Sequence, residues 1–208
     1  MSRRLFVALL PPRAVLDELD AVVALLRDEE PALRWTPTEA WHVTLAFLGA
    51  VEQPAVDELA GPLARVALAH GPFRLAIAGA GRFGEQVLWA VVTGNAEPLR
   101  RLADSVRAAA RLCGVEVETR PYRGHITLAR GAAGVDLRPL VERLRVFAGP
   151  PWTATDLHLV ESRLGAGPGR TALHETYARW PLRQQRSLGR SSSPARTDRR
   201  WAEPPAAA

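Results

Sequence analysis

The fold is decided by two short stretches of the chain, WHVTLAFLG at residues 41–49 and GHITLAR at residues 124–130. In both, a histidine is followed two positions later by a threonine, among the apolar and β-branched residues that favour strands. The second histidine lies 83 residues after the first. A repeat of this kind, each copy preceded by a helical pattern, predicts two similar lobes that face each other.

Strand geometry predicts which of these side chains meet. Successive residues of a strand point to opposite faces. His42 and Thr44 are therefore expected on one face and Phe47 on the opposite, core-facing one. The same alternation brings His125 and Thr127 together. Two such strands facing each other would place two imidazoles and two hydroxyls around one cleft.

These four groups suit displacement at phosphorus. One imidazole can take a proton from the entering oxygen while the other gives one to the leaving oxygen, because the ordinary histidine pKa lies near neutrality. Threonine hydroxyls can donate to the non-bridging oxygens. One such histidine alone is more often structural, but the repeat makes catalysis the better reading of His42 and His125. Neither stretch carries the third ligand of a metal site, so we expect no metal and no cofactor.

The remaining pattern predicts an α+β domain over residues 1–182. The single cysteine, Cys113, excludes an intramolecular disulfide and fits a reducing cytoplasm. No apolar run reaches the roughly 20 residues that cross a bilayer. Apolar spacing predicts helices at 12–27, 53–69, 99–112 and 137–146, and strands at 5–10, 41–48, 73–78, 86–92, 124–129, 155–162 and 176–180, with a glycine-rich turn at 79–84.

The basic charge of the chain is concentrated at its C-terminal end. All 27 basic residues are arginine, and the net charge is +5. Six arginines and two acidic residues follow Leu182, so residues 1–182 carry a net charge of only +1. Residues 183–208, rich in Arg, Ser, Pro and Ala, are expected to form a disordered tail. The near-neutral body carries no electrostatic indication of a nucleic-acid partner.

The chain resembles the two-histidine phosphoesterase superfamily. Within it, the similarity is to the bacterial and archaeal RNA 2',3'-cyclic phosphodiesterases, also known as LigT-like or 2'-5' RNA ligase proteins. It extends from about residue 4 to residue 182. It is carried by RLFVAL at 4–9, WHVTLAFLG at 41–49, RF at 82–83 with VLWA at 87–90, HITLAR at 125–130, LVESRL at 159–164 and RWPL at 179–182.

The resemblance implies a fold, a reaction and two residue roles. The fold would be two pseudo-symmetric lobes, each an antiparallel sheet with outer helices, on either side of a central cleft. The reaction would hydrolyse the 2',3'-cyclic phosphate at an RNA end, such as that of a tRNA half or a short oligonucleotide, to a 2'-phosphate. His42 would be the general acid and His125 the general base. We expect a monomer that acts without a membrane.

The sequence leaves further functions and residue roles open. The protein could instead be a 2'-5' RNA ligase, a phosphodiesterase for small cyclic nucleotides, or a non-catalytic RNA- or nucleotide-binding module. Arg130 matches an arginine of the family and suits phosphate binding, yet strict alternation places it on the face away from His125 and Thr127, where it could instead form a structural ion pair. Tyr122 is expected to pack. The remaining histidines, at positions 70, 158 and 174, are expected to be structural or solvated.

Overall fold

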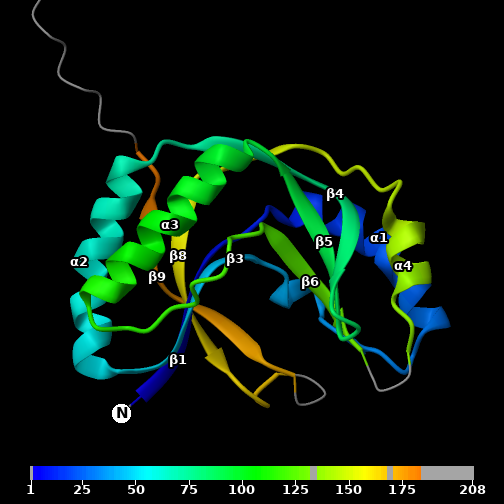
Figure 1. The fold of residues 1–208 in the computed structure, drawn as a ribbon, viewed down its shortest axis with the longest axis horizontal. Coiled ribbons are helices and arrows are strands. Elements are labelled where there is room, and N and C mark those ends of the chain that lie inside the picture. The colour runs from blue at the N-terminus through cyan, green and yellow to red at the C-terminus, as the bar shows by residue number, and fades with distance from the viewer. Residues whose placement is uncertain (1, 132–134, 168–170, 184–208) are drawn as a thin grey trace, which may run out of the picture.

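The computed structural model describes residues 2–131, 135–167 and 171–183, and Figure 1 shows the fold as a ribbon. The α+β class and the two antiparallel sheets agree with the expectation from sequence. The predicted disordered tail lies outside the described residues except for Arg183. Within the described part of the chain, no helix is long and apolar enough to cross a membrane.

Each motif belongs to a different sheet. The first sheet has the strand order β3-β1-β8-β9, and the second has the order β2-β6-β5-β4-β7. The motif at His42 leads into β3 at one edge of the first sheet, whereas the motif at His125 forms β6, inside the second. The strands are β1 (Ser2–Leu9), β2 (Arg34–Trp35), β3 (Val43–Glu52), β4 (Phe73–Phe83), β5 (Val87–Gly94), β6 (His125–Arg130), β7 (Trp152–Ala154), β8 (Asp156–Arg163) and β9 (Leu173–Pro181).

Helices cover the outer sides of the two sheets (Figure 1). They are α1 (Arg13–Glu29), α2 (Gln53–Ala69), α3 (Ala96–Leu112) and α4 (Arg138–Leu144), with a 3-10 turn at Thr38–Ala40. Helices α2 and α3 pack on each other and on β3 of the first sheet, while α4 packs on β4 and β5 of the second. An ion pair between Glu29 and Arg143 joins α1 to α4. In the sequence, helix α3 comes directly after β5 of the second sheet. In the structure it packs on the first sheet.

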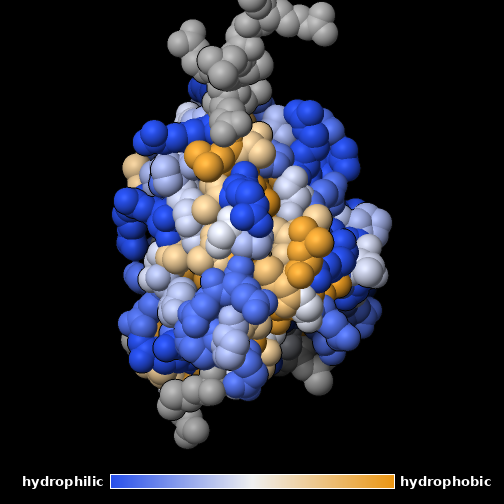
Figure 2. All heavy atoms as spheres, turned by 90° about the vertical axis from the view of Figure 1, so that its left-hand side faces the viewer, coloured by the Kyte–Doolittle hydropathy of each residue, from blue (hydrophilic) through white to orange (hydrophobic). Residues whose placement is uncertain are grey.

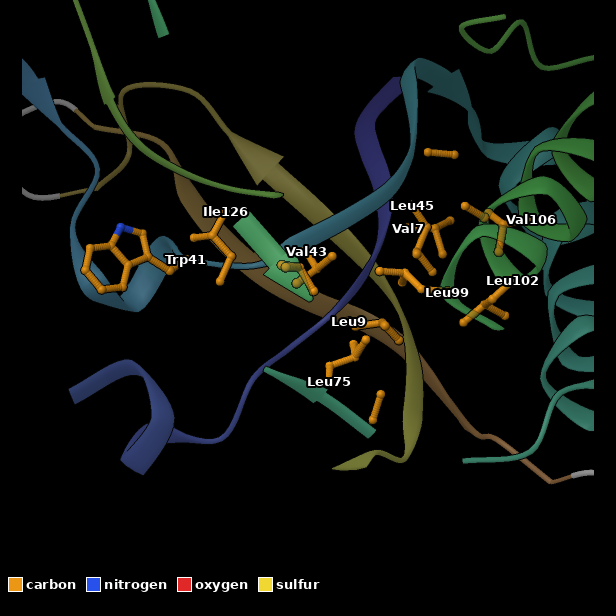
Figure 3. Packing of buried hydrophobic residues seen from close by; sticks show 14 of the residues in the cluster. Val7, Leu9, Trp41, Val43, Leu45, Leu75, Leu99, Leu102, Val106 and Ile126 are labelled. Carbon is orange, nitrogen blue, oxygen red and sulfur yellow. The ribbon is translucent and has the colours of Figure 1, made fainter. Parts of the chain in front are cut away.

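One apolar core joins the two sheets. Val43 and Ile126, the residues between the histidine and the threonine of each motif, are both fully buried in it (Figure 3). Side chains of α3 such as Leu99, Leu102 and Val106 belong to the same cluster. Burying one such side chain stabilises the fold by about 1.5–3 kcal/mol. Each motif is thus held in place by its apolar residue, and its polar residues point away from the core.

One face of the molecule is mostly polar (Figure 2), as expected when most apolar side chains are buried in the core. Figure 2 shows the side of the molecule that lies to the left in Figure 1, and it is mostly hydrophilic with apolar side chains gathered in a central band. The exposed large apolar residues of the described chain include Phe47 and Phe83, at 55% and 38% exposure. Phe47 belongs to β3, which carries the first motif, and Phe83 to β4, which is separated from β6 by β5.

The sequence predicted most elements but not the shortest ones. The helix Gln53–Ala69 has the expected bounds. Strands β2 and β7 were not predicted, because two or three residues carry no measurable periodicity. The glycine-rich segment at 79–84 was expected to be a turn, but β4 continues through it to Phe83. Gly81 lies beneath the ring of Trp89, where a Cβ atom would come within 2.4 Å of the indole. The glycine allows this strand to pass under the ring.

Candidate active site

The two histidines are held by the same local device. The Nδ1 of His42 lies 2.7 Å from the carbonyl oxygen of Ala40, and the Nδ1 of His125 lies 2.8 Å from that of Arg123. In both, the ring bonds to the carbonyl two residues earlier. A carbonyl can only accept, so Nδ1 carries the proton in each ring. The second nitrogen, Nε2, is thereby left to accept or donate a proton in chemistry.

The two motifs lie side by side. Cα atoms of β3 and β6 come within 8 Å of each other. The hydroxyl of Tyr122, just before the second motif, donates to the carbonyl oxygen of Thr44 at 3.1 Å. Tyr122 therefore fastens one motif to the other, which agrees with the packing role expected for it.

A cavity of about 660 Å³ opens between the sheets. Thr44 and Phe47 line it from the first sheet, and His125, Thr127 and Arg130 line it from the second. The cavity thus collects four of the five predicted site residues. The fifth, His42, is not among its lining residues and is packed beside Thr44 against aromatic rings.

Arg130 faces this cavity because β6 contains a β-bulge. Trp89 of β5 pairs with Thr127, whereas the adjacent Leu88 pairs with Ala129, so Leu128 is an extra residue without a partner in the ladder. A bulge of this kind breaks the alternation of faces. The prediction that Arg130 points away from His125 is therefore wrong, because it assumed a regular strand.

A bulge at the matching position of β3 redirects Phe47. Ala8 of β1 pairs with Thr44, and the adjacent Val7 pairs with Ala46, so Leu45 is the extra residue. Phe47 consequently lies across from Phe6, on the face of Thr44. The prediction that Phe47 faces the core is wrong for the same reason. Phe47 and Arg130 occupy equivalent places, five residues after their respective histidines.

His42 lies in a cluster of three rings. It stacks on Phe6 at 4.4 Å between ring centroids, and the ring of His174 meets it edge-on at 5.2 Å. Burial lowers the pKa of His42 to about 4, and the neighbouring His174 and His125 act in the same direction. The free protein therefore holds His42 neutral near pH 7.

His174 is a neighbour of His42 that the sequence did not reveal. It was expected to be structural or solvated, and the packing of its ring from β9 against His42 and Phe6 agrees with a structural place. Its Nδ1 is buried and has no hydrogen-bond partner among the described residues. No motif surrounds it, and only the pairing of β9 with β8 brings it to this face.

His125 has its own aromatic surroundings. The ring of Phe83 meets it edge-on at 4.9 Å, and Trp89 lies at 5.8 Å. Phe83 and Trp89 stack on each other at 4.9 Å. Burial lowers the pKa of His125, and the nearby guanidinium of Arg123 adds to that effect. The second imidazole is therefore also neutral near pH 7, as a general base must be.

The cavity is more basic than the body of the chain as a whole. Four arginines line it, against one acidic residue, Glu118. Arg123 lies over the ring of Trp89, and Arg107 over that of Tyr122. Net charge did not indicate a nucleic-acid partner because it averages over the whole surface. The structure concentrates positive charge where the two motifs meet.

Further candidate groups lie elsewhere in the fold. The Nε2 of His70 bonds to Ser105 Oγ at 2.9 Å and joins α2 to α3. Cys113 is half-buried, and burial raises the pKa of its thiol. Within residues 2–131, 135–167 and 171–183, no three histidine, cysteine or acidic side chains come together as a metal-binding group.

Comparison with known proteins identifies similar sequences and folds. The sequence model of the 2'-5' RNA ligase superfamily matches residues 11–166. An RNA 2',3'-cyclic phosphodiesterase of Thermus thermophilus is 33% identical over 207 residues, covering 92% of this chain and 98% of the relative. One of Geobacillus stearothermophilus is 32% identical over 157 residues, which are 73% of this chain.

Coverage of these relatives is uneven. The chain spans 48% of the Geobacillus protein and 62% of the RNA 2',3'-cyclic phosphodiesterase of Bacillus subtilis. Among solved structures, the apo form of LigT from E. coli superposes with a TM-score of 0.69 at 25% identity. The match covers 88% of this chain and 99% of LigT. The two-lobed fold is thus shared over nearly the whole described chain.

Proposed function

This chain belongs to the 2'-5' RNA ligase superfamily, and on that premise we propose that it is an RNA 2',3'-cyclic phosphodiesterase. One observation carries the proposal. Two imidazoles, each with Nδ1 bonded to the carbonyl two residues earlier, stand where β3 and β6 meet, and His125 is near enough to lower the pKa of His42. Two threonines and Arg130 share the cavity there. The names of the relatives point to the same activity as this geometry.

Each of the two histidines carries out one proton transfer of the reaction. His125 is the base: its Nε2 removes a proton from water, and the oxygen attacks phosphorus opposite the ribose 3'-oxygen. The bond from phosphorus to the 3'-oxygen breaks, and His42 delivers a proton from Nε2 to that oxygen. One water is consumed, and the product keeps its phosphate on the 2'-oxygen. Both imidazoles then exchange their protons with solvent.

The threonines, Arg130 and two exposed rings bind the substrate. The hydroxyls of Thr44 and Thr127 donate to the non-bridging oxygens, where the negative charge is carried. Arg130 adds a guanidinium, a group that matches phosphate geometry. Phe47 and Phe83 offer exposed rings on which a base can stack.

The low pKa of His42 fits this role once substrate is bound. An acid must be protonated, yet burial holds the pKa of His42 at about 4 in the free protein. A phosphate anion next to an imidazole favours the charged ring and raises its pKa. Substrate binding therefore favours the protonated form of His42, which can act as the general acid.

The decisive experiment uses a short RNA that ends in a 2',3'-cyclic phosphate, incubated without added metal and with excess chelator. We expect a product with a 2'-phosphate, identified because a general phosphatase removes the phosphate whereas a 3'-specific phosphatase does not. A product joined through a 2'-5' linkage would instead make the protein a ligase. Turnover of small cyclic nucleotides alone would make it a phosphodiesterase for those compounds, and no turnover at all would favour a non-catalytic binding module.

We also propose which RNA the protein acts on and where in the cell it does so. RNA ends such as those of tRNA halves or short oligonucleotides are the expected substrates, and the chain would act as a monomer in the cytoplasm. The single cysteine supports a reducing compartment.

A further inference from the structure

One wall of the cavity carries arginines to which the reaction assigns no role. It consists of residues 117, 118 and 120–123, which lie between α3 and β6, together with one side chain of α3. We call it the arginine wall after its three basic residues, Arg107, Arg120 and Arg123. Along the chain, His125 and Thr127 separate this wall from Arg130, which serves the reacting phosphate. The wall is therefore available to another part of a substrate.

Contacts within the fold hold the arginine wall in place. The hydroxyl of Tyr122 donates to a carbonyl oxygen of β3, which joins the wall to the first sheet. The guanidinium of Arg107 lies 5.4 Å from the ring centroid of Tyr122, and its Nη1 donates to the carbonyl oxygen of Arg120 at 3.1 Å. The guanidinium of Arg123 lies 5.7 Å from the ring centroid of Trp89. Because two of the three side chains are already held, binding an anion costs less of their conformational freedom.

The positive charge of the wall is only partly neutralised. Within the described parts of the chain, neither Arg107 nor Arg123 forms an ion pair with an acidic side chain. Arg120 pairs with Glu118, the one acidic residue among the described residues that line the cavity. By contrast, Arg100 on the same helix as Arg107 pairs with two acidic side chains of α3. Three arginines against one acid leave the wall with a net charge of +2, which attracts anions.

Positive charge beside exposed rings matches a strand of RNA. Single-stranded nucleic acid is bound by basic grooves that follow its phosphates and by aromatic side chains on which its bases stack. The cavity combines both, because Phe47 and Phe83 line it together with the arginine wall. A cyclic mononucleotide has only the reacting phosphate and leaves the wall without a ligand. An oligonucleotide has one further phosphate for each further nucleotide.

We propose that the arginine wall binds the phosphodiester backbone on the 5' side of the terminal nucleotide. This inference rests on the proposed function and adds a substrate class to it. The reacting phosphate stays with His125, Thr127 and Arg130. The wall selects RNA ends over 2',3'-cyclic mononucleotides, because only RNA ends have phosphates that reach it.

The test compares substrates that differ in backbone charge. They are adenosine 2',3'-cyclic phosphate, the trinucleotide ApApA with a terminal 2',3'-cyclic phosphate, and the same trinucleotide with two uncharged methylphosphonate linkages. The intact protein should prefer the charged trinucleotide over both other compounds in kcat/KM by about tenfold, as expected for charge-assisted contacts. Arg107→Gln and Arg120→Gln should each reduce the ratio of charged to uncharged trinucleotide. Arg107→Lys keeps the charge and should retain most of that ratio.

Glu118 offers a variant with the opposite effect. Glu118→Gln removes the acid that pairs with Arg120 and makes the wall more positive, so it should increase the ratio. Arg101→Gln is the matched control, because it removes one exposed arginine of α3 from outside the cavity lining and should leave the ratio unchanged.

Melting temperatures separate binding from folding. Arg107→Gln loses a contact with the ring of Tyr122 and can lower the melting temperature. The side chain of Arg120 is 86% exposed, so Arg120→Gln should melt like the intact protein and still show the reduced ratio. Arg123 is left in place, because its carbonyl holds His125.

Several outcomes would overturn the inference. One is an intact protein that treats the charged and uncharged trinucleotides alike. Another is a ratio that is unchanged in the folded Arg120→Gln variant and in its combination with Arg107→Gln. If the intact protein turns over none of the three substrates, the proposed function fails instead. The inference is then judged from the Kd of ApApA 2'-phosphate at several salt concentrations. Loss of both arginines should reduce the slope of log Kd against log salt by about 1.4, and an unchanged slope would refute it.

Discussion

At the scale of the residue, the two histidines are alike in their backbone hydrogen bonds and different in their neighbours. Each Nδ1 is fixed by the carbonyl two residues earlier. His42 is enclosed by Phe6 and His174, whereas His125 opens onto the cavity. The deeper ring is suited to give a proton to a bound oxygen, and the more open one to meet water.

Replacing the two histidines should therefore have different consequences. His42→Ala should lose about 10²–10⁴-fold in rate on the cyclic-phosphate RNA. It should lose far less on a nitrophenyl phosphodiester, whose leaving group needs no proton. His125→Ala should be slow on both, because both need activated water. Steady-state rates with the two substrates measure this, and rescue of His125→Ala by the nitrophenyl ester would reverse the assignment.

The buried His42 should also make the fold sensitive to acid. Its pKa is about 4 when folded and about 6.5 when unfolded, so the unfolded chain binds more protons between these values. Stability should fall as the pH drops from about 6.5 to 4, by up to about 3 kcal/mol from this residue. Urea unfolding at pH 7.5 and pH 4 should show a smaller loss in His42→Gln than in the intact protein. An equal loss in both would place the acid sensitivity elsewhere.

His174 offers a matched pair of variants. Its Nδ1 is buried without a partner among the described residues, which costs about 1–3 kcal/mol. His174→Phe keeps the ring contacts with Phe6 and His42 and removes that nitrogen, so it should raise the free energy of unfolding. His174→Ala loses the contacts and should lower it. Chemical denaturation compares them. A less stable Phe variant would mean that an ordered water satisfies Nδ1.

At the scale of the element, β-bulges account for what the sequence predicted and what it did not. His42 with Thr44 and His125 with Thr127 stand two residues apart, before any bulge, so simple alternation places them correctly. Phe47 and Arg130 come after a bulge, and alternation places both on the wrong face. A bulge depends on how a strand pairs with its neighbour. The local sequence alone does not reveal that pairing.

The close approach of Gly81 in β4 to the ring of Trp89 can be tested by substitution. Gly81→Ala would place a Cβ atom 2.4 Å from an indole that supports His125. It should cost about 1–3 kcal/mol of stability and reduce kcat through a displaced His125. Gly61→Ala, in α2, has only ordinary contact with Arg65 and should be neutral or stabilising. Denaturation and steady-state kinetics of both variants provide the comparison, and equal stability of the two would contradict this account of Gly81.

At the scale of the whole molecule, the charge distribution matters more than the net charge. The chain is basic mainly through residues after Leu182, yet the arginines that line the cavity belong to the folded body. The sequence alone allowed the two lobes to be predicted from a repeated motif. It did not allow the basic cavity to be predicted, because residues 107, 120, 123 and 130 come together only through the fold.

The placement of α3 has a consequence for how the protein unfolds. This helix is encoded between β5 and β6 of the second sheet but packs on β3 of the first, and its apolar residues join the common core. Neither half of the chain thus contains all the parts of one lobe. If the two lobes arose by duplication, neither lobe can now fold without the other. Calorimetry should show one cooperative transition, with equal calorimetric and van't Hoff enthalpies, and a fragment ending before α3 should remain unfolded.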